Sequence, residues 1–178
     1  MGTLILKHRL TLVVAACAAA FVLVCTLGAL APAGSATVPT AQASTPATYV
    51  AAVYNGPTAI VNKLNKSKST PTVKTASLTK TKLVLKSGKY GKINIAGTVT
   101  SMKKAKSFKL AKGCKFYKQT LKNGSYKLTK VSKNSYKKAL KSLSKKRGNT
   151  VPRSIGAISF ATNSKGHVTD ALYYVYKR

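Results

Sequence analysis

A large excess of positive charge limits the folds available to this chain. Lysine and arginine account for 32 of its 178 residues, and Asp170 is its one acidic residue, so the formal net charge is +31. Most of these cations cannot pair within the chain, so the folded protein must tolerate strong self-repulsion. The length suits one domain with an appendage, and a hydrophobic content of 44 % supplies a small core.

The scarcity of acidic residues also excludes several kinds of chemistry. Glycosidases with paired carboxylates, hard-metal cages and carboxylate-based phosphoryl transfer all need aspartates and glutamates that this chain lacks. We therefore expect a protein that is not an enzyme and carries no cofactor.

The N-terminus has the pattern of a secretory signal peptide. Lys7 and Arg9 precede an apolar run over residues 10–30, and small residues at Ala41 and Ala43 follow. We expect cleavage after Ala43, or after Ala33. The alternative is an uncleaved anchor, because about 20 apolar residues can also span a bilayer. Either way the protein is expected to be secreted or attached to the cell surface, and a leader this long and alanine-rich is typical of Gram-positive bacteria.

Three parts are expected along the chain. Residues 1–43 form the signal peptide or anchor, residues 44–75 a linker with possible short helices, and residues 76–178 a small β-rich domain. A possible helix over residues 49–64 is interrupted by Asn55-Gly56-Pro57. Cleavage would leave Cys114 as the one cysteine, so an internal disulfide is not available and stability must come from the core.

The domain shows alternating strand patterns and one helix pattern. Strands are expected at residues 81–86, 92–99, 108–110, 114–121, 126–128, 155–161 and 167–176, with turns at Ser87-Gly88, Asn123-Gly124 and residues 163–166. Ser132 can cap a helix in which Tyr136, Ala139, Leu140 and Leu143 share one face, and Arg147-Gly148 is expected to end it.

Several short motifs in this region resemble a known kind of module. They are Ile95-Ala96-Gly97-Thr98-Val99, a Phe-x-Leu strand, the serine-led helix, an Ile-Ser-Phe strand and a closing turn that begins at Asn163. Together, over residues 78–176, they resemble the small β-barrel modules, similar to oligonucleotide/oligosaccharide-binding (OB) folds, of secreted and cell-wall-associated Gram-positive proteins. The resemblance implies a mainly β (α+β), partly open OB-like barrel with one helix and no catalytic residues. This chain departs from the pattern by carrying lysine where such modules carry aspartate.

The basic residues are 28 lysines and four arginines. Lysine acts as a flexible point charge, whereas the planar fork of arginine recognises bases and carboxylates, so this ratio favours loosely structured polyanions over sequence-specific DNA. Lys133, Lys137, Lys141 and Lys145 are spaced by four residues along the expected helix. The predicted anion-binding residues are these four together with Lys82, Lys86, Lys109 and Lys127. A surface that serves solubility alone is the alternative interpretation.

Two further kinds of site are considered. Cys114, His167 and Asp170 occur in the order of a thiol hydrolase, and flanking lysines would lower the pKa of Cys114. No local signature surrounds Cys114, and one histidine with one cysteine is too few ligands for a metal site. Seven tyrosines of the domain could offer stacking platforms, although half or more are expected in the core.

The expected function is therefore non-specific electrostatic binding of polyanions at the cell envelope. The candidate partners are teichoic acid, anionic lipid surfaces and extracellular or other nucleic acid, with no defined protein partner. One alternative is a cationic membrane-active or antimicrobial protein, and a second is the thiol hydrolase that uses Cys114 and His167.

Overall fold

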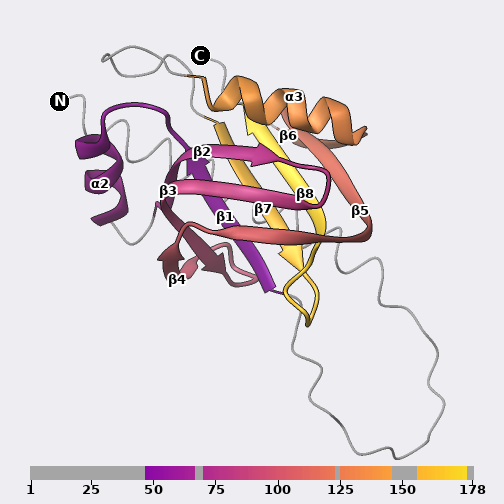
Figure 1. Ribbon diagram of the computed structural model, residues 1–178, viewed down its shortest axis with the longest axis horizontal. Helices are drawn as coiled ribbons and strands as arrows, with labels where there is room; N and C mark the ends of the chain where they lie inside the picture. The colour runs from indigo at the N-terminus through magenta and orange to yellow at the C-terminus, as the bar shows by residue number, and fades with distance from the viewer. Residues whose placement is uncertain (1–46, 67–69, 123–124, 146–155, 176–178) are drawn as a thin grey trace, which may run out of the picture.

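The computed structural model describes residues 47–66, 70–122, 125–145 and 156–175 (Figure 1). In chain order the elements are β1 (Ala47–Val53), α2 (Thr58–Lys66), β2 (Thr72–Leu78), β3 (Lys82–Ile93), β4 (Val99–Lys104), β5 (Ser107–Lys122), β6 (Ser125–Val131), α3 (Lys133–Leu143), β7 (Gly156–Thr162) and β8 (Val168–Val175). The expected signal peptide, the turn at Asn123-Gly124 and the expected helix end at Arg147-Gly148 lie outside the described residues.

Six strands form a closed ring. Their hydrogen-bonded order is β3-β2-β1-β7-β8-β5, and a pairing between β5 and β3 closes it. That seam is short: residues Lys82, Leu83 and Val84 lie opposite Lys109, Phe108 and Ser107. β4 extends the sheet from β3, and β6 extends it from β5. The predicted small, mainly β barrel of OB-like type is confirmed, but its ring is closed rather than partly open, and the described residues contain two helices rather than the one expected.

The barrel interior is filled by alternate residues of the strands. On β3, Leu83 and Leu85 are buried whereas Lys82 and Lys86 are exposed, as the alternation predicts. Aromatic rings dominate the centre: the ring centroids of Phe108 and Phe160 lie 4.7 Å apart, and those of Tyr90 and Phe108 lie 5.1 Å apart. These rings bury apolar surface in the described part of the chain, where no ion pair contributes to stability.

Helix α3 lies across one end of the strands and packs onto the core (Figure 1). Its start is as predicted, because the backbone N–H of Ser135 donates to the Ser132 Oγ at 3.1 Å. The predicted face is also confirmed for Tyr136, Leu140 and Leu143, which are buried.

The helix ends earlier than predicted, at Leu143, with Ser144 as its C-cap. The side chain of Ser144 docks on β2: its Oγ accepts from the Ala76 N–H and donates to the Ala76 carbonyl, both at 2.9 Å. A tertiary contact therefore ends the helix before the Arg147-Gly148 signal is reached.

The structure corrects the predicted linker over residues 44–75. β1 is a barrel strand that pairs with β7 along its whole length and also with β2 and β3. Its alternation is hidden because both faces are covered: Ala51 faces the core, while Ala52 packs against Leu64 of α2. The expected helix is thus a strand up to Val53, and α2 follows the Asn55-Gly56-Pro57 break.

Two strand boundaries also differ from the prediction. The chain does not turn at Ser87-Gly88, because β3 continues through it with Ser87 at φ 57°. Gly88 is needed there because a Cβ would lie 2.1 Å from the Thr72 carbonyl oxygen.

The strand expected over residues 92–99 is wrong: the Asn94 Oδ1 starts a tight turn by accepting from the Thr98 N–H at 2.9 Å. Ile95 is consequently 83 % exposed.

The remaining β elements follow the sequence pattern more closely. The two strands expected over residues 108–110 and 114–121 are one long strand, β5. The turn over residues 163–166 is confirmed, with the Asn163 Oδ1 accepting from the N–H groups of Lys165 and His167. β7 and β8 lie where the sequence predicts strands, and the predicted end residues Ile155 and Tyr176 lie outside the described residues.

Candidate anion-binding surface

The lysines of the described chain lie in solvent. Every lysine whose side chain is described is exposed, apart from Lys74, which is partly buried. No ion pair joins two of the described residues, and Asp170, the one acidic residue of the sequence, is partly buried on β8. The outer surface of the barrel and its helix therefore carries uncompensated positive charge.

The structure brings some of the predicted lysines together. Lys82 and Lys109 lie directly opposite each other across the β3–β5 seam. Like charges in that position repel each other, so an anion bound between them would relieve the repulsion. Lys86 lies further along β3, opposite Thr75 of β2, and Lys127 is apart from them on β6, opposite Thr120.

The helical stripe is shorter than predicted. Lys133, Lys137 and Lys141 are exposed on α3, but Lys145 follows the end of the helix. The i,i+4 spacing still places the three helical lysines in one row.

A second cross-strand lysine pair was missed by the sequence analysis. Lys89 of β3 lies opposite Lys104 of β4. Lys89 also lines a hollow of about 400 Å³ together with Lys66, Thr100 and Ser101. Strand alternation marks these lysines as exposed, but their proximity depends on the pairing register, which was not predicted for β4.

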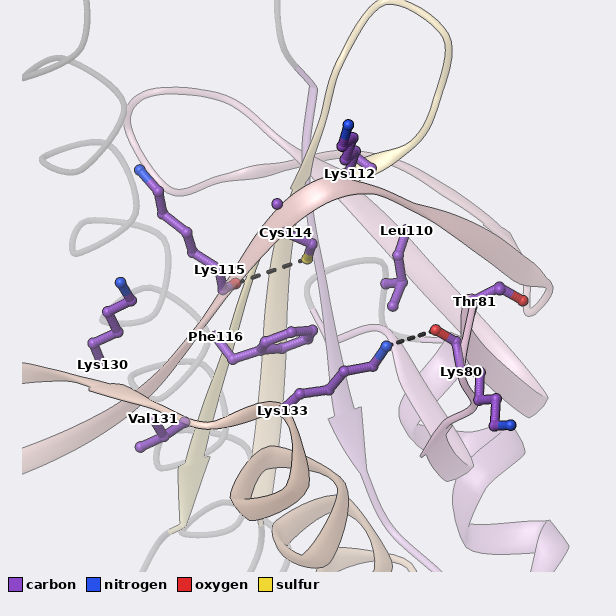
Figure 2. A pocket seen from close by; sticks show the side chains of 12 residues that line it. Lys80, Thr81, Leu110, Lys112, Cys114, Lys115, Phe116, Lys130, Val131 and Lys133 are labelled. Carbon is purple, nitrogen blue, oxygen red and sulfur yellow. Dashed lines mark hydrogen bonds between the residues drawn. The ribbon is translucent and has the colours of Figure 1, made fainter.

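The larger pocket has a volume of about 710 Å³ and lies where three separate segments meet (Figure 2). These are the connection between β2 and β3, the middle of β5, and the junction between β6 and α3. The β5 backbone makes room for it, because its pairing with β8 shifts register between Leu110 and Lys115. Gly113 sits within this irregularity at φ 76°, a conformation that favours glycine.

This pocket has an apolar lining and a basic rim. Leu110, Phe116 and Val131 supply the apolar surface, and Lys80, Lys112, Lys115, Lys130 and Lys133 surround it. Figure 2 shows the side chains of Lys112, Lys115 and Lys130 extending away from the centre, whereas Lys133 reaches across it. The Lys133 ammonium donates to the Lys80 carbonyl oxygen at 2.6 Å. Of the eight predicted lysines, Lys133 is the one that lines this pocket.

Cys114 also lines the pocket, but its predicted activation is wrong. Burial, and secondarily the charge of Asp170, raise the pKa of the Cys114 thiol to about 12, and Lys133 only partly opposes this. The Sγ donates to the Lys115 carbonyl oxygen at 3.8 Å. Within the described part of the chain, no hydrogen bond connects Cys114 with His167 or His167 with Asp170. The thiol is therefore held neutral rather than poised as a nucleophile.

The tyrosines mostly serve the core, as half or more were expected to do. Tyr90, Tyr136, Tyr173 and Tyr174 are buried, and burial raises the pKa of Tyr90 and Tyr173. Tyr126 is 40 % exposed. Tyr176 lies outside the described residues.

Comparison of the chain with known protein families, curated proteins and solved structures found no significant match. Neither described helix has the length and apolar character needed to cross a bilayer. Among the described residues, no group of three histidine, cysteine or acidic side chains could hold a metal ion.

Proposed function

We propose that this is an exported, non-catalytic protein that binds polyanions of the cell envelope or its surroundings by non-specific electrostatics. Teichoic acid, anionic lipid surfaces and extracellular DNA are the candidate partners. The observation that carries the proposal is the exposure of the described lysines without a described ion pair. Such a surface lowers its own repulsion when it binds an external anion, and displaced counterions add to the affinity.

The kind of cation supports a loosely structured partner. Of the 32 basic residues of the chain, 28 are lysines and four are arginines. Lysine ammonium groups attract phosphates as point charges and do not impose the geometry of a bidentate guanidinium. We therefore assign the predicted lysines to a distributed surface that includes the Lys82–Lys109 pair and the row on α3.

A salt series on two triple variants tests this function. Binding of teichoic acid or duplex DNA should fall steeply as NaCl rises. Lys82→Gln/Lys86→Gln/Lys109→Gln and Lys133→Gln/Lys137→Gln/Lys141→Gln should each reduce the slope of log K against log[NaCl] by up to about 2 to 3. The two reductions should be similar, because the surface is distributed.

The matched controls replace the same lysines by arginine and should keep the salt slope. Affinity that does not change with salt, or no binding in dilute buffer, would contradict the proposal. If one triple variant lost all binding and the other lost none, the binding site would be local rather than distributed.

A second candidate function, membrane activity, is favoured by one observation. Leu121 and Tyr126 form a cross-strand pair of β5 and β6, and they are 50 % and 40 % exposed. Lys118 and Lys127 lie nearby on the same two strands and are exposed. An apolar and aromatic pair beside lysines suits an anionic membrane interface. Dye release from anionic vesicles, lost in Leu121→Ser/Tyr126→Ser, would favour this candidate over polymer binding.

A further inference from the structure

The pocket between β5 and α3 differs from the rest of the lysine surface because it offers apolar contacts. Leu110, Phe116 and Val131 all line it; Phe116 is buried, and Leu110 and Val131 are partly buried. Phe116 and Val131 are also direct cross-strand partners on β5 and β6. A hydrophilic polyanion could use the lysines around the pocket but would gain nothing from this lining.

One cationic side chain crosses that apolar lining. Five lysines line the pocket, and Lys133 reaches across it to the Lys80 carbonyl oxygen, whereas Lys112, Lys115 and Lys130 extend away from its centre (Figure 2). Lys133 is held by a carbonyl oxygen of the β2–β3 connection, so its position does not depend on an acidic side chain. An anionic group of a ligand could take the place of that carbonyl or share the ammonium, which has three donors.

We propose that this pocket binds a single-chain amphiphilic anion, an alkyl or acyl chain that ends in a phosphate or a carboxylate. The chain lies against Leu110, Phe116 and Val131, and the anionic end is bound by Lys133 with the surrounding lysines. The volume of about 710 Å³ lies within the range typical of sites for small molecules. The neutral thiol of Cys114 fits this role, because it adds a weakly polar surface and no negative charge.

Titration of the full chain with four probes tests the ligand class. The probes are dodecyl phosphate, dodecanoate, inorganic phosphate and dodecyltrimethylammonium, each below its micelle concentration. Dodecyl phosphate, dodecanoate or both should bind at least about tenfold more tightly than inorganic phosphate, and the cation should not bind. The two anionic amphiphiles distinguish a phosphate end from a carboxylate end. Equal affinity for inorganic phosphate, or equal affinity for the cationic amphiphile, would overturn the proposal.

Variants then locate the site. Ala111 lines the pocket, and Ala111→Phe should fill it and weaken amphiphile binding by at least about tenfold. Lys133→Gln should weaken it by about fivefold or more, because a charge-assisted contact is lost. Lys138→Gln is the matched control: it makes the same charge change on α3 but lies outside the pocket lining, and it should change affinity less than about twofold. Full affinity in Ala111→Phe, or equal losses in the two lysine variants, would refute the assignment.

A chemical probe covers the case in which Ala111→Phe does not fold. In a chain with Cys17→Ser and Cys25→Ser, Cys114 is the one remaining cysteine. Dodecyl phosphate should slow maleimide labelling of Cys114, and an unchanged labelling rate at saturating ligand would count against the pocket.

This site can be separated from the proposed function. Ala111→Phe should retain the binding of duplex DNA, because it removes no charge. Amphiphile binding by a wild-type chain that does not bind DNA or teichoic acid would support the pocket and contradict the distributed surface.

Discussion

At the scale of single residues, burial decides the chemistry of Cys114. Its sequence neighbours Lys112 and Lys115 are exposed, with their charges in solvent, while the thiol itself is partly buried. Burial raises the free energy of the thiolate by more than the nearby cations lower it, so the thiol keeps its proton. The local sequence favours an activated cysteine, and the packing of β5 reverses that expectation.

Alkylation of Cys114 should therefore show a displaced pH profile. In a Cys17→Ser/Cys25→Ser chain, the iodoacetamide rate should be low at pH 7 and should still be rising above pH 10, towards a pKa of about 12. The guanidinium-unfolded chain, as control, should titrate near the ordinary value of 9.0. A rate that levels off between pH 7 and 9 in the folded protein would contradict this.

The raised pKa of the Cys114 thiol also makes the stability of the fold depend on pH. The thiol pKa is higher in the folded state than in the unfolded state, so the folded protein binds the proton more tightly. The contribution of this residue to stability is therefore independent of pH below about 9 and is lost progressively as the pH rises towards about 12.

At the scale of elements, α3 combines a well-packed face with a repulsive one. Tyr136, Leu140 and Leu143 anchor it in the core. On the exposed side, Lys137 has a lysine at i−4 and another at i+4, and no acidic side chain offsets them. Each like-charge pair lowers the stability of the helix by about 0.2 to 0.5 kcal/mol, so the lysine row destabilises α3.

Lys137→Glu should make the protein more stable and a weaker polyanion binder. It converts two repulsive pairs into attractive ones, which should raise the free energy of unfolding by about 1 kcal/mol at low salt. Urea denaturation measures this. Lys138→Glu is the matched control, because Lys138 has no lysine at i±4, and its gain should be smaller. An equal or larger gain for Lys138→Glu would show that helical pairing is not the cause.

At the scale of the whole molecule, the positive surface opposes the compact state. The ring of six strands holds these charges at close range, and its closing seam is only three residue pairs long. Salt shortens the range of the repulsion, since the Debye length falls from about 30 Å at 0.01 M to about 10 Å at 0.1 M. On the proposed function, a bound polyanion would neutralise the repulsion directly and would bind the folded surface in preference to the unfolded chain.

The melting temperature should therefore rise with NaCl, and rise further with polyphosphate at the same ionic strength. At a free polyanion concentration 100 times Kd, the stabilisation should approach about 2.7 kcal/mol if the unfolded chain does not bind. Differential scanning calorimetry measures both effects. A melting temperature that is unchanged by salt would contradict the repulsion, and equal effects of NaCl and polyphosphate would contradict preferential binding.

Elements with a local residue pattern were predictable from the sequence alone. Leu83 and Leu85 alternate with lysines because one face of β3 meets the core and the other meets water. Ser132, Tyr136 and Leu140 likewise define the start and the buried face of α3. The exposure of the lysines also follows from the sequence, because a buried cation without an acidic partner is too costly.

Which of these segments lie side by side depends on contacts between residues far apart in the chain. β1 is covered on both faces, so its residues carry no alternation that could distinguish it from a linker. Ser87-Gly88 has the composition of a turn, but close packing against Thr72 keeps it within β3. The pocket joins Lys80, Cys114 and Lys133 from three distant segments, and no local pattern encodes that meeting. Periodicity records which side of a segment is buried, whereas the partner that buries it depends on long-range pairing.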